Sequence, residues 1–128
     1  MQKAWLASVS WDLVTALNAQ LCETKQALHK PTSDGHDVTR DLWNESHRRE
    51  MSWDEAVELC RKCHKIAPFC FFNGNTFAAI IKIVVKQASN LDARDQYALQ
   101  SISAHIVAGT ATPEEEAQFK SLLGKIGG

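Results

Sequence analysis

The sequence predicts an all-α protein, a single compact domain over residues 1–128 with five to six helices around a central helix–turn–helix unit. Three observations predict this fold class. Apolar residues recur at helical spacing in most segments, capping patterns precede several of them, and no segment offers a partner strand to the one stretch that is ambiguous between helix and strand. The length and an apolar fraction of 45% fit one globular domain with its own core.

The first helix is expected to begin after Ser10, whose hydroxyl is a good helix cap, with Asp12 well placed for the helix dipole. Pro31 and the polar residues after it indicate a loop, so this loop should end the helix. The apolar side of the helix is a stripe of leucines at steps of four, four and seven: Leu13, Leu17, Leu21 and Leu28.

A shorter second helix is expected to open at Asp37 or Thr39. It should turn three apolar residues inward: Val38, Leu42 and Trp43.

The third helix opens the central unit, which runs from Ser52 to Gln87. Ser52 and Glu55 form a capping-box pattern, in which each side chain bonds the backbone of the other. Pro68 must stop or kink the helix. Its apolar positions fall at helical spacing: Ala56, Leu59, Cys60, Cys63 and Ile66.

The pair Asn73-Gly74 is a strong turn signal, because both residue types tolerate positive φ. The apolar segment after it could be a strand by periodicity alone. Its length through Gln87 and a capable cap at Asn75 or Thr76 favour a buried helix.

Two more helices are expected at the C-terminal end. Asp92 begins the first, which Gly109 closes. Thr112 and Pro113 begin the second, which Gly124 ends. The inward residues are Leu99, Ile102, His105 and Ile106 in the first helix and Phe119, Leu122 and Leu123 in the second.

The balance of charge excludes some partners. The net charge is −1 and no basic block is present, so we expect no nucleic-acid binding. The charged run 45–50, with His47 in it, is typical of a solvated helix face; the alternative is that Arg48 and Arg49 bind an anion. No apolar stretch is long enough to span a bilayer, which predicts a soluble cytoplasmic protein without a membrane partner.

The cysteines indicate core positions rather than a cofactor site. Cys60, Cys63 and His64 match the spacing that attaches c-type haem, and the same pair could be half of a zinc site. For haem, no export signal is present and no Met lies well placed downstream as a second ligand. For zinc, no second pair of ligands lies at short spacing. We therefore expect reduced, mostly buried thiols, no metal and no cofactor.

The turn at 73–76 is the candidate ligand site. Backbone N–H groups of such a turn, together with the free donors of a helix start, form a concavity that suits an anion. The alternative is a purely structural turn. The candidate ligand-binding residues are Asn73, Gly74, Asn75, Thr76, His64 and Arg48. The candidate partner-binding residues are aromatic: Phe69, Phe71, Phe72 and Trp43.

The stretch Ala67-Pro68-Phe69-Cys70-Phe71-Phe72-Asn73-Gly74-Asn75-Thr76 resembles the core of the Fic/Doc family. In that family a helix leads into H-P-F-x-[D/E]-G-N-G-R, and a second helix follows directly. The positions that match are Pro68, Phe69, Asn73, Gly74 and Thr76. The resemblance is confined to Ser52–Gln87, and it implies an all-α fold and nucleotide-dependent transfer of AMP or phosphate.

The family's catalytic positions are changed in this chain. Ala67 stands at the position of the catalytic His, Phe71 at the metal-binding acid, Phe72 at a glycine of the anion nest and Asn75 at the phosphate-binding Arg. A transferase would need another base, such as His64 or His47.

Two functions from different classes follow. The first is a non-enzymatic binding or regulatory protein that contacts a protein or a small anionic ligand, such as a nucleotide, at the 67–77 turn. The alternative is a Fic-type nucleotide-dependent transferase with non-standard catalytic residues. The absence of an acid–base set favours the first, and the residues leave self-association into a homo-oligomer open.

Overall fold

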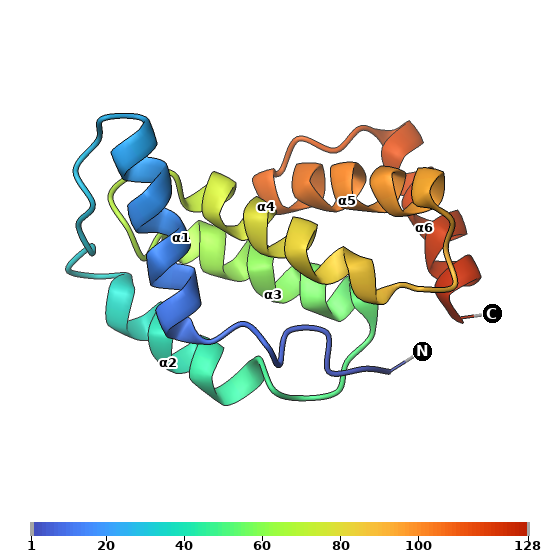
Figure 1. Cartoon of the computed structure of the whole chain (residues 1–128), viewed down its shortest axis with the longest axis horizontal. Coiled ribbons are helices and arrows are strands. Elements are labelled where there is room, and N and C mark those ends of the chain that lie inside the picture. Colours follow the sequence, from blue (N-terminus) through green and yellow to red (C-terminus); the bar gives the residue numbers. More distant parts are fainter. Residues whose placement is uncertain (1, 128) are drawn as a thin grey trace.

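The computed structural model describes residues 2–127, which form six α-helices and no sheet (Figure 1). The prediction of a compact all-α domain is confirmed. The helices are α1 (Trp11–Thr24), α2 (His36–Ser46), α3 (Trp53–Ile66), α4 (Asn73–Val84), α5 (Ala93–Ala108) and α6 (Pro113–Gly127), with a short 3-10 turn η1 (Val85–Gln87) after α4. Among the described residues, no helix is both long enough and apolar enough to cross a membrane.

Helix α4 lies at the centre and packs against α1, α3 and α5 (Figure 1). Its buried side chains fall at i, i+3, i+4 and i+7: Phe77, Ile80, Ile81 and Val84. Burial of each contributes about 2 kcal/mol relative to exposure. The stretch that was ambiguous between helix and strand is therefore a helix, because three neighbouring helices bury one face of it.

The N-terminal residues belong to the core although they precede the first helix. Trp5, Leu6 and Val9 are buried. The backbone of Lys3 exchanges two hydrogen bonds of 2.9 Å with Met51, just before α3. The Lys3 ammonium donates to the carbonyl of Gln87 at 2.9 Å. This segment closes the core between α3 and the end of α4.

The predicted caps form as expected. The Ser10 hydroxyl accepts from the Leu13 N–H, and Ser52 and Glu55 form the reciprocal capping box of α3. Asp92 caps α5. Thr112 and Glu115 bond each other's backbone N–H groups at 3.1 Å at the start of α6. A cap of this kind is worth about 1 kcal/mol.

Helix α1 is shorter than predicted, and its buried side differs. The helix ends at Thr24, because the N–H of Ala27 bonds back to the carbonyl of Cys22 while Gln26 adopts a left-handed conformation (φ 56°). Leu28 lies outside the helix and is 66% exposed. The other three leucines are only half-buried, and the residues that face the core are Trp11, Val14, Asn18 and Cys22.

Helix α2 also departs from the prediction. Val38 is 56% exposed, and Thr39 takes the inward position, where its hydroxyl donates to the carbonyl of Gly35. His47 is buried instead of solvated. It stacks on Trp43, and its Nδ1–H donates to the Trp43 carbonyl at 2.8 Å.

Three boundaries and one inward position are corrected further along the chain. Helix α2 begins at His36, α4 begins at Asn73 rather than after a cap at Asn75 or Thr76, and α6 continues past Gly124. His105 is exposed rather than inward, because it pairs with Glu115 of α6.

Candidate functional site

The 67–77 turn is held against the loop between α1 and α2. The N–H of Thr32 donates to the carbonyl of Pro68, and the N–H of Cys70 donates to the carbonyl of Lys30, both at 3.0 Å. The Thr32 hydroxyl adds a bond of 2.6 Å to the carbonyl of Ala67. These bonds pair the two loops in antiparallel fashion, which fixes the turn before α4.

The polar side chains of the turn bond to the protein itself. Asn73 uses both ends of its amide on Phe69: Nδ2 donates to the carbonyl at 2.7 Å, and Oδ1 accepts from the N–H at 3.0 Å. The Thr76 hydroxyl donates to the carbonyl of Phe72 and accepts from Asn18. These bonds give Asn73 and Thr76 a structural role. Asn75, by contrast, is exposed.

Phe72 begins α4 in an unusual way. Its backbone is left-handed (φ 61°, ψ 34°), a conformation that costs about 1 kcal/mol in a residue other than glycine. The first helical bond runs from the N–H of Thr76 to the carbonyl of Phe72. The three residues between Phe72 and Thr76 form the first turn of the helix. Their backbone N–H groups have no acceptor within the helix, because no helical residue precedes them by four positions.

The structure brings His64 to this turn but not Arg48. A Cβ on Gly74 would lie 3.4 Å from Cε1 and 3.5 Å from Nε2 of His64, so the ring packs against the first turn of α4. The other ring nitrogen, Nδ1, donates to the carbonyl of Val107 at 2.8 Å. The start of α2 contacts the end of α3, next to the turn, whereas Arg48 follows the other end of α2. Because α2 is about 16 Å long, Arg48 lies far from the turn.

Two of the four aromatic candidates are not on the surface. Trp43 is buried, as expected for an inward residue of α2, and does not present a ring to a partner. Phe69 is also buried, so the expectation that it presents an exposed ring is wrong. Phe69 stacks on Trp11 with 5.9 Å between ring centroids, and the indole N–H of Trp43 donates to the carbonyl of Val9. The Phe71 side chain is 47% exposed, and its neighbour Phe72 is half-buried.

The Cys60 and Cys63 thiols lie in the core, as predicted. Burial raises the pKa of Cys63 to about 12 and the pKa of Cys60 well above its usual value. Both are therefore protonated at neutral pH, and neither supplies a thiolate. Cys22 is also buried and Cys70 is exposed, so the thiols are mostly buried, as expected. Within residues 2–127, no three His, Cys, Asp or Glu side chains are grouped closely enough to hold a metal ion.

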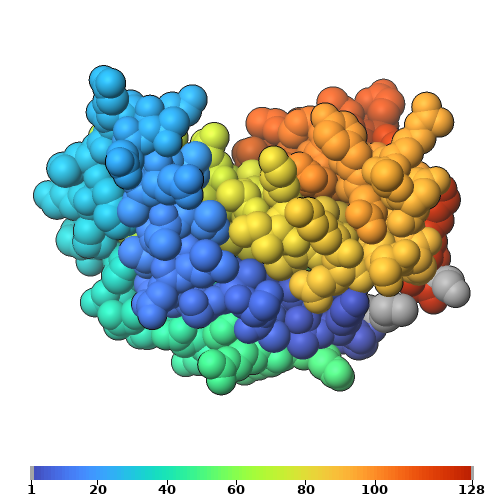
Figure 2. Space-filling model, in the orientation of Figure 1, coloured from blue at the N-terminus to red at the C-terminus, as the bar shows by residue number. Residues whose placement is uncertain are grey.

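A groove over α4 is a feature that the sequence did not reveal. Figure 2 shows a hollow between α1, in blue, and α5, in orange, with yellow α4 at its base. The hollow has a volume of about 290 Å³. We call it the α4 groove, and its lining residues are Leu21, Asn75, Ala78, Ala79, Lys82, Tyr97, Gln100, Ser101 and Ala104. Small side chains on two different helices form it, so only their packing shows it.

A comparison of the chain with models of protein families, with curated proteins and with solved structures found no match. Because no relative defines the class of the protein, only its fold and surface describe it. It is a small all-α domain with a central buried helix. In particular, this domain carries an open groove along the outer face of that helix, and the rigid turn with exposed Phe71 precedes the groove.

Proposed function

We propose that the chain is a non-enzymatic binding module that receives an amphipathic, acidic helix of a partner protein in the α4 groove. The observation that carries this proposal is the α4 groove itself, which small side chains and the exposed ring of Tyr97 line, with exposed Phe71 in the turn that precedes α4. The carbonyl of Phe71 accepts a bond of 2.7 Å from Asn18, which lies one helical turn before the groove residue Leu21. The Tyr97 ring lines the groove and is exposed, and an exposed aromatic ring of this kind is typical of an anchor in a protein interface.

The shape of the groove suits a helix. Ala78 and Ala79 lie on the face of α4 that lines the groove, and Ala104 and Ser101 line it from α5. Side chains this small permit the close approach of another helix, whose apolar residues would contact Leu21 and the 71%-exposed ring of Tyr97.

The charge of the groove suits acidic residues on the partner. Lys82 is the one ionisable side chain with a fixed positive charge among the lining residues, and no carboxylate lines the groove. Lys86, one turn further along the chain, is also exposed. Carboxylates at the edge of the bound helix would face these ammonium groups, which gives orientation and faster association.

The test compares capture by three forms of the protein. Ala79→Arg fills the groove, and Val38→Arg places the same residue on the exposed face of α2 as a control. Partners captured by wild type are identified by quantitative mass spectrometry, and the acidic helical segment of each is made as a peptide. The proposal expects the peptide to bind wild type and Val38→Arg, to lose affinity for Ala79→Arg, and to bind more weakly at high salt. Equal binding by both arginine variants, or failure of every such peptide to bind, would contradict it.

One observation supports a Fic-type transferase as a second candidate. His64 packs against Gly74, at the start of the helix where the family binds phosphates. His47 does not serve this candidate, because it is buried and bonded to Trp43. Incubation with labelled ATP and Mg²⁺ tests the idea, with His64→Ala and the exposed-site control His105→Ala. A transferase would lose label transfer only in His64→Ala. No transfer by wild type, together with no thermal shift with nucleotides and Mg²⁺, would remove this candidate.

A further inference from the structure

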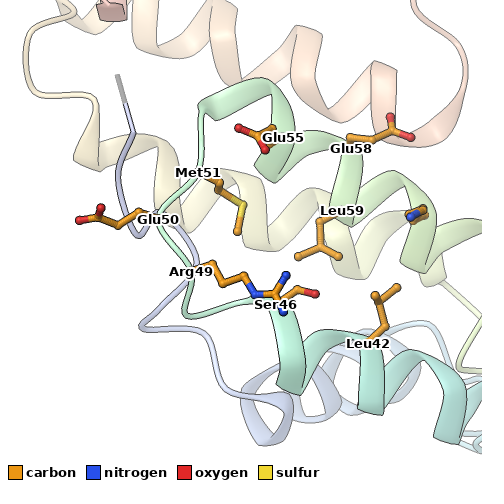
Figure 3. Close-up of a pocket in the computed structure, with 9 residues that line it drawn as sticks. Leu42, Ser46, Arg49, Glu50, Met51, Glu55, Glu58 and Leu59 are labelled. Atoms are coloured by element: carbon orange, nitrogen blue, oxygen red, sulfur yellow. The ribbon is translucent and has the colours of Figure 1, made fainter.

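A second pocket lies on another face of the molecule, between the end of α2 and the first half of α3 (Figure 3). It has a volume of about 300 Å³, at the lower end of the range for small-molecule sites. Three apolar side chains make its floor: Leu42 from α2, Met51 from the connecting loop and Leu59 from α3. A ligand with a short apolar body therefore fits this pocket.

The carboxylates beside the pocket are already bonded. The carboxylate of Glu55 accepts from the N–H and the hydroxyl of Ser52 at 3.1 and 2.8 Å. The carboxylate of Glu58 is bidentate to the guanidinium of Arg61 at 2.9 and 3.1 Å. These bonds lower the pKa of both groups. The two carboxylates are thus held by partners on α3 and stay ionised; Arg61 offsets part of the charge of Glu58, and Glu55 keeps its negative charge beside the pocket.

The remaining charges near the pocket are Arg49, Glu50 and Lys62. Figure 3 shows the guanidinium of Arg49 beside Ser46 and beneath Leu59, whereas the carboxylate of Glu50 points away from the other labelled side chains. Within residues 2–127, neither Arg49 nor Lys62 takes part in an ion pair. Arg49 and Lys62 are therefore the two cationic side chains of the lining that a ligand can use, and a guanidinium matches the geometry of a carboxylate.

We propose that this pocket binds a small amphipathic anion, a carboxylate at the end of a short apolar chain. The carboxylate bonds Arg49, and the chain lies over Leu42, Met51 and Leu59. This site is separate from the α4 groove, and its test does not depend on the proposed function.

Octanoate is the probe, and its binding is followed by chemical-shift changes of backbone amides and by calorimetry. The matched variants are Arg49→Gln and Arg48→Gln, because Arg48 is the adjacent arginine but does not line the pocket. We expect shifts at Leu42, Met51 and Leu59, affinity about tenfold or more weaker in Arg49→Gln, and no change in Arg48→Gln. Ser46→Phe, which fills the pocket from its rim, should abolish binding.

Ligand controls separate the two parts of the proposal. Acetate, which lacks the chain, and octylammonium, which reverses the charge, should both bind more weakly than octanoate. The proposal is overturned if octanoate fails to bind, if its shifts map elsewhere, if octylammonium binds as tightly, or if the two arginine variants weaken binding equally. Each variant is first shown to unfold at a temperature close to that of wild type, and for one that does not, Ser46→Phe and the ligand controls decide.

Discussion

Replacement of Asn18 by alanine should destabilise the protein more than any change at a surface asparagine. Asn18 is buried in α1, and its amide bonds three groups outside its own helix. Nδ2 donates to the carbonyl of Phe71 at 2.7 Å and to the hydroxyl of Thr76 at 3.1 Å. Oδ1 lies 2.8 Å from Nδ1 of His29. One side chain thus joins α1, the loop after it and the turn before α4.

The magnitude follows from these bonds. A typical hydrogen bond contributes about 1 kcal/mol net, so the loss of three costs about 3 kcal/mol. Alanine recovers about 0.5 kcal/mol through its higher helix propensity. We therefore expect Asn18→Ala to lower the free energy of unfolding by about 2 to 3 kcal/mol. With a urea dependence of about 1 to 3 kcal/mol per molar, the midpoint falls by roughly 0.7 to 3 M.

The assay is equilibrium urea unfolding, followed by circular dichroism and by tryptophan fluorescence. Asn44→Ala is the control, because Asn44 is an exposed residue of helix α2, and its effect should stay within about 0.5 kcal/mol. A loss below about 1 kcal/mol for Asn18→Ala would refute the reasoning. It would mean that water replaces the amide at no cost and that the amide does not hold the turn in place.

Three further predictions concern backbone space, thiols and acid. Gly35→Ala should destabilise the protein by about 1 to 3 kcal/mol in the same assay, because the new Cβ would lie 2.5 Å from the carbonyl oxygens of Ile66 and Ala67. Gly124→Ala is the matched control inside α6. Its Cβ would have no neighbour within 4 Å, so the better helix propensity of alanine should stabilise the protein by about 0.5 to 1 kcal/mol. In the native protein a thiol reagent should label Cys70 fast and the three buried cysteines only on unfolding; equal labelling of all four would disagree with the core. The Thr112 N–H and His105 lower the pKa of Glu115. The charged carboxylate therefore stabilises the protein above the pKa of the unfolded state, and this contribution is lost as the pH falls through the lower pKa of the folded state. When the free energy of unfolding is measured from about pH 7 to pH 2, Glu115→Gln should be less stable than wild type at neutral pH and equally stable in acid.

The elements of this fold could be predicted from the sequence where local chemistry decides them. Ser52 with Glu55, Asp92, and Thr112 with Pro113 start helices because their own side chains satisfy the first backbone donors. The end of α1 could not be predicted, because Gln26 takes the left-handed position that usually signals itself by a glycine.

The orientation of the helices was less predictable than their existence. The leucines of α1 form a clear stripe, yet the helix is turned so that Asn18 faces the core and bonds the turn before α4. His47 belongs to a charged run in the sequence, but it stacks on Trp43 and bonds the Trp43 carbonyl, and this gives it a buried place. Both polar residues are buried because each has a hydrogen-bond partner there. The partner of His47 is four residues away, whereas those of Asn18 lie on other segments.

The candidate sites divide in the same way. Asn73 and Gly74 were expected to form a turn, but they are the first residues of α4, and the left-handed residues that precede the helix are Ala67 and Phe72. His64 does lie against Gly74. No pattern in the neighbouring sequence indicated that both ends of the Asn73 amide would bond the backbone of Phe69. The α4 groove and the pocket beside Arg49 arise between helices, and such surfaces depend on packing that periodicity does not encode.

The position of the N-terminal segment has a consequence for how the chain reaches this structure. Lys3 finds one partner in Met51 and another in Gln87, which is 84 residues away. The contacts of this segment can therefore form only after α3 and α4 have been synthesised, since Met51 and Gln87 flank these two helices. A purification tag is better placed after α6 than in front of Trp5, because Trp5 is buried in the core.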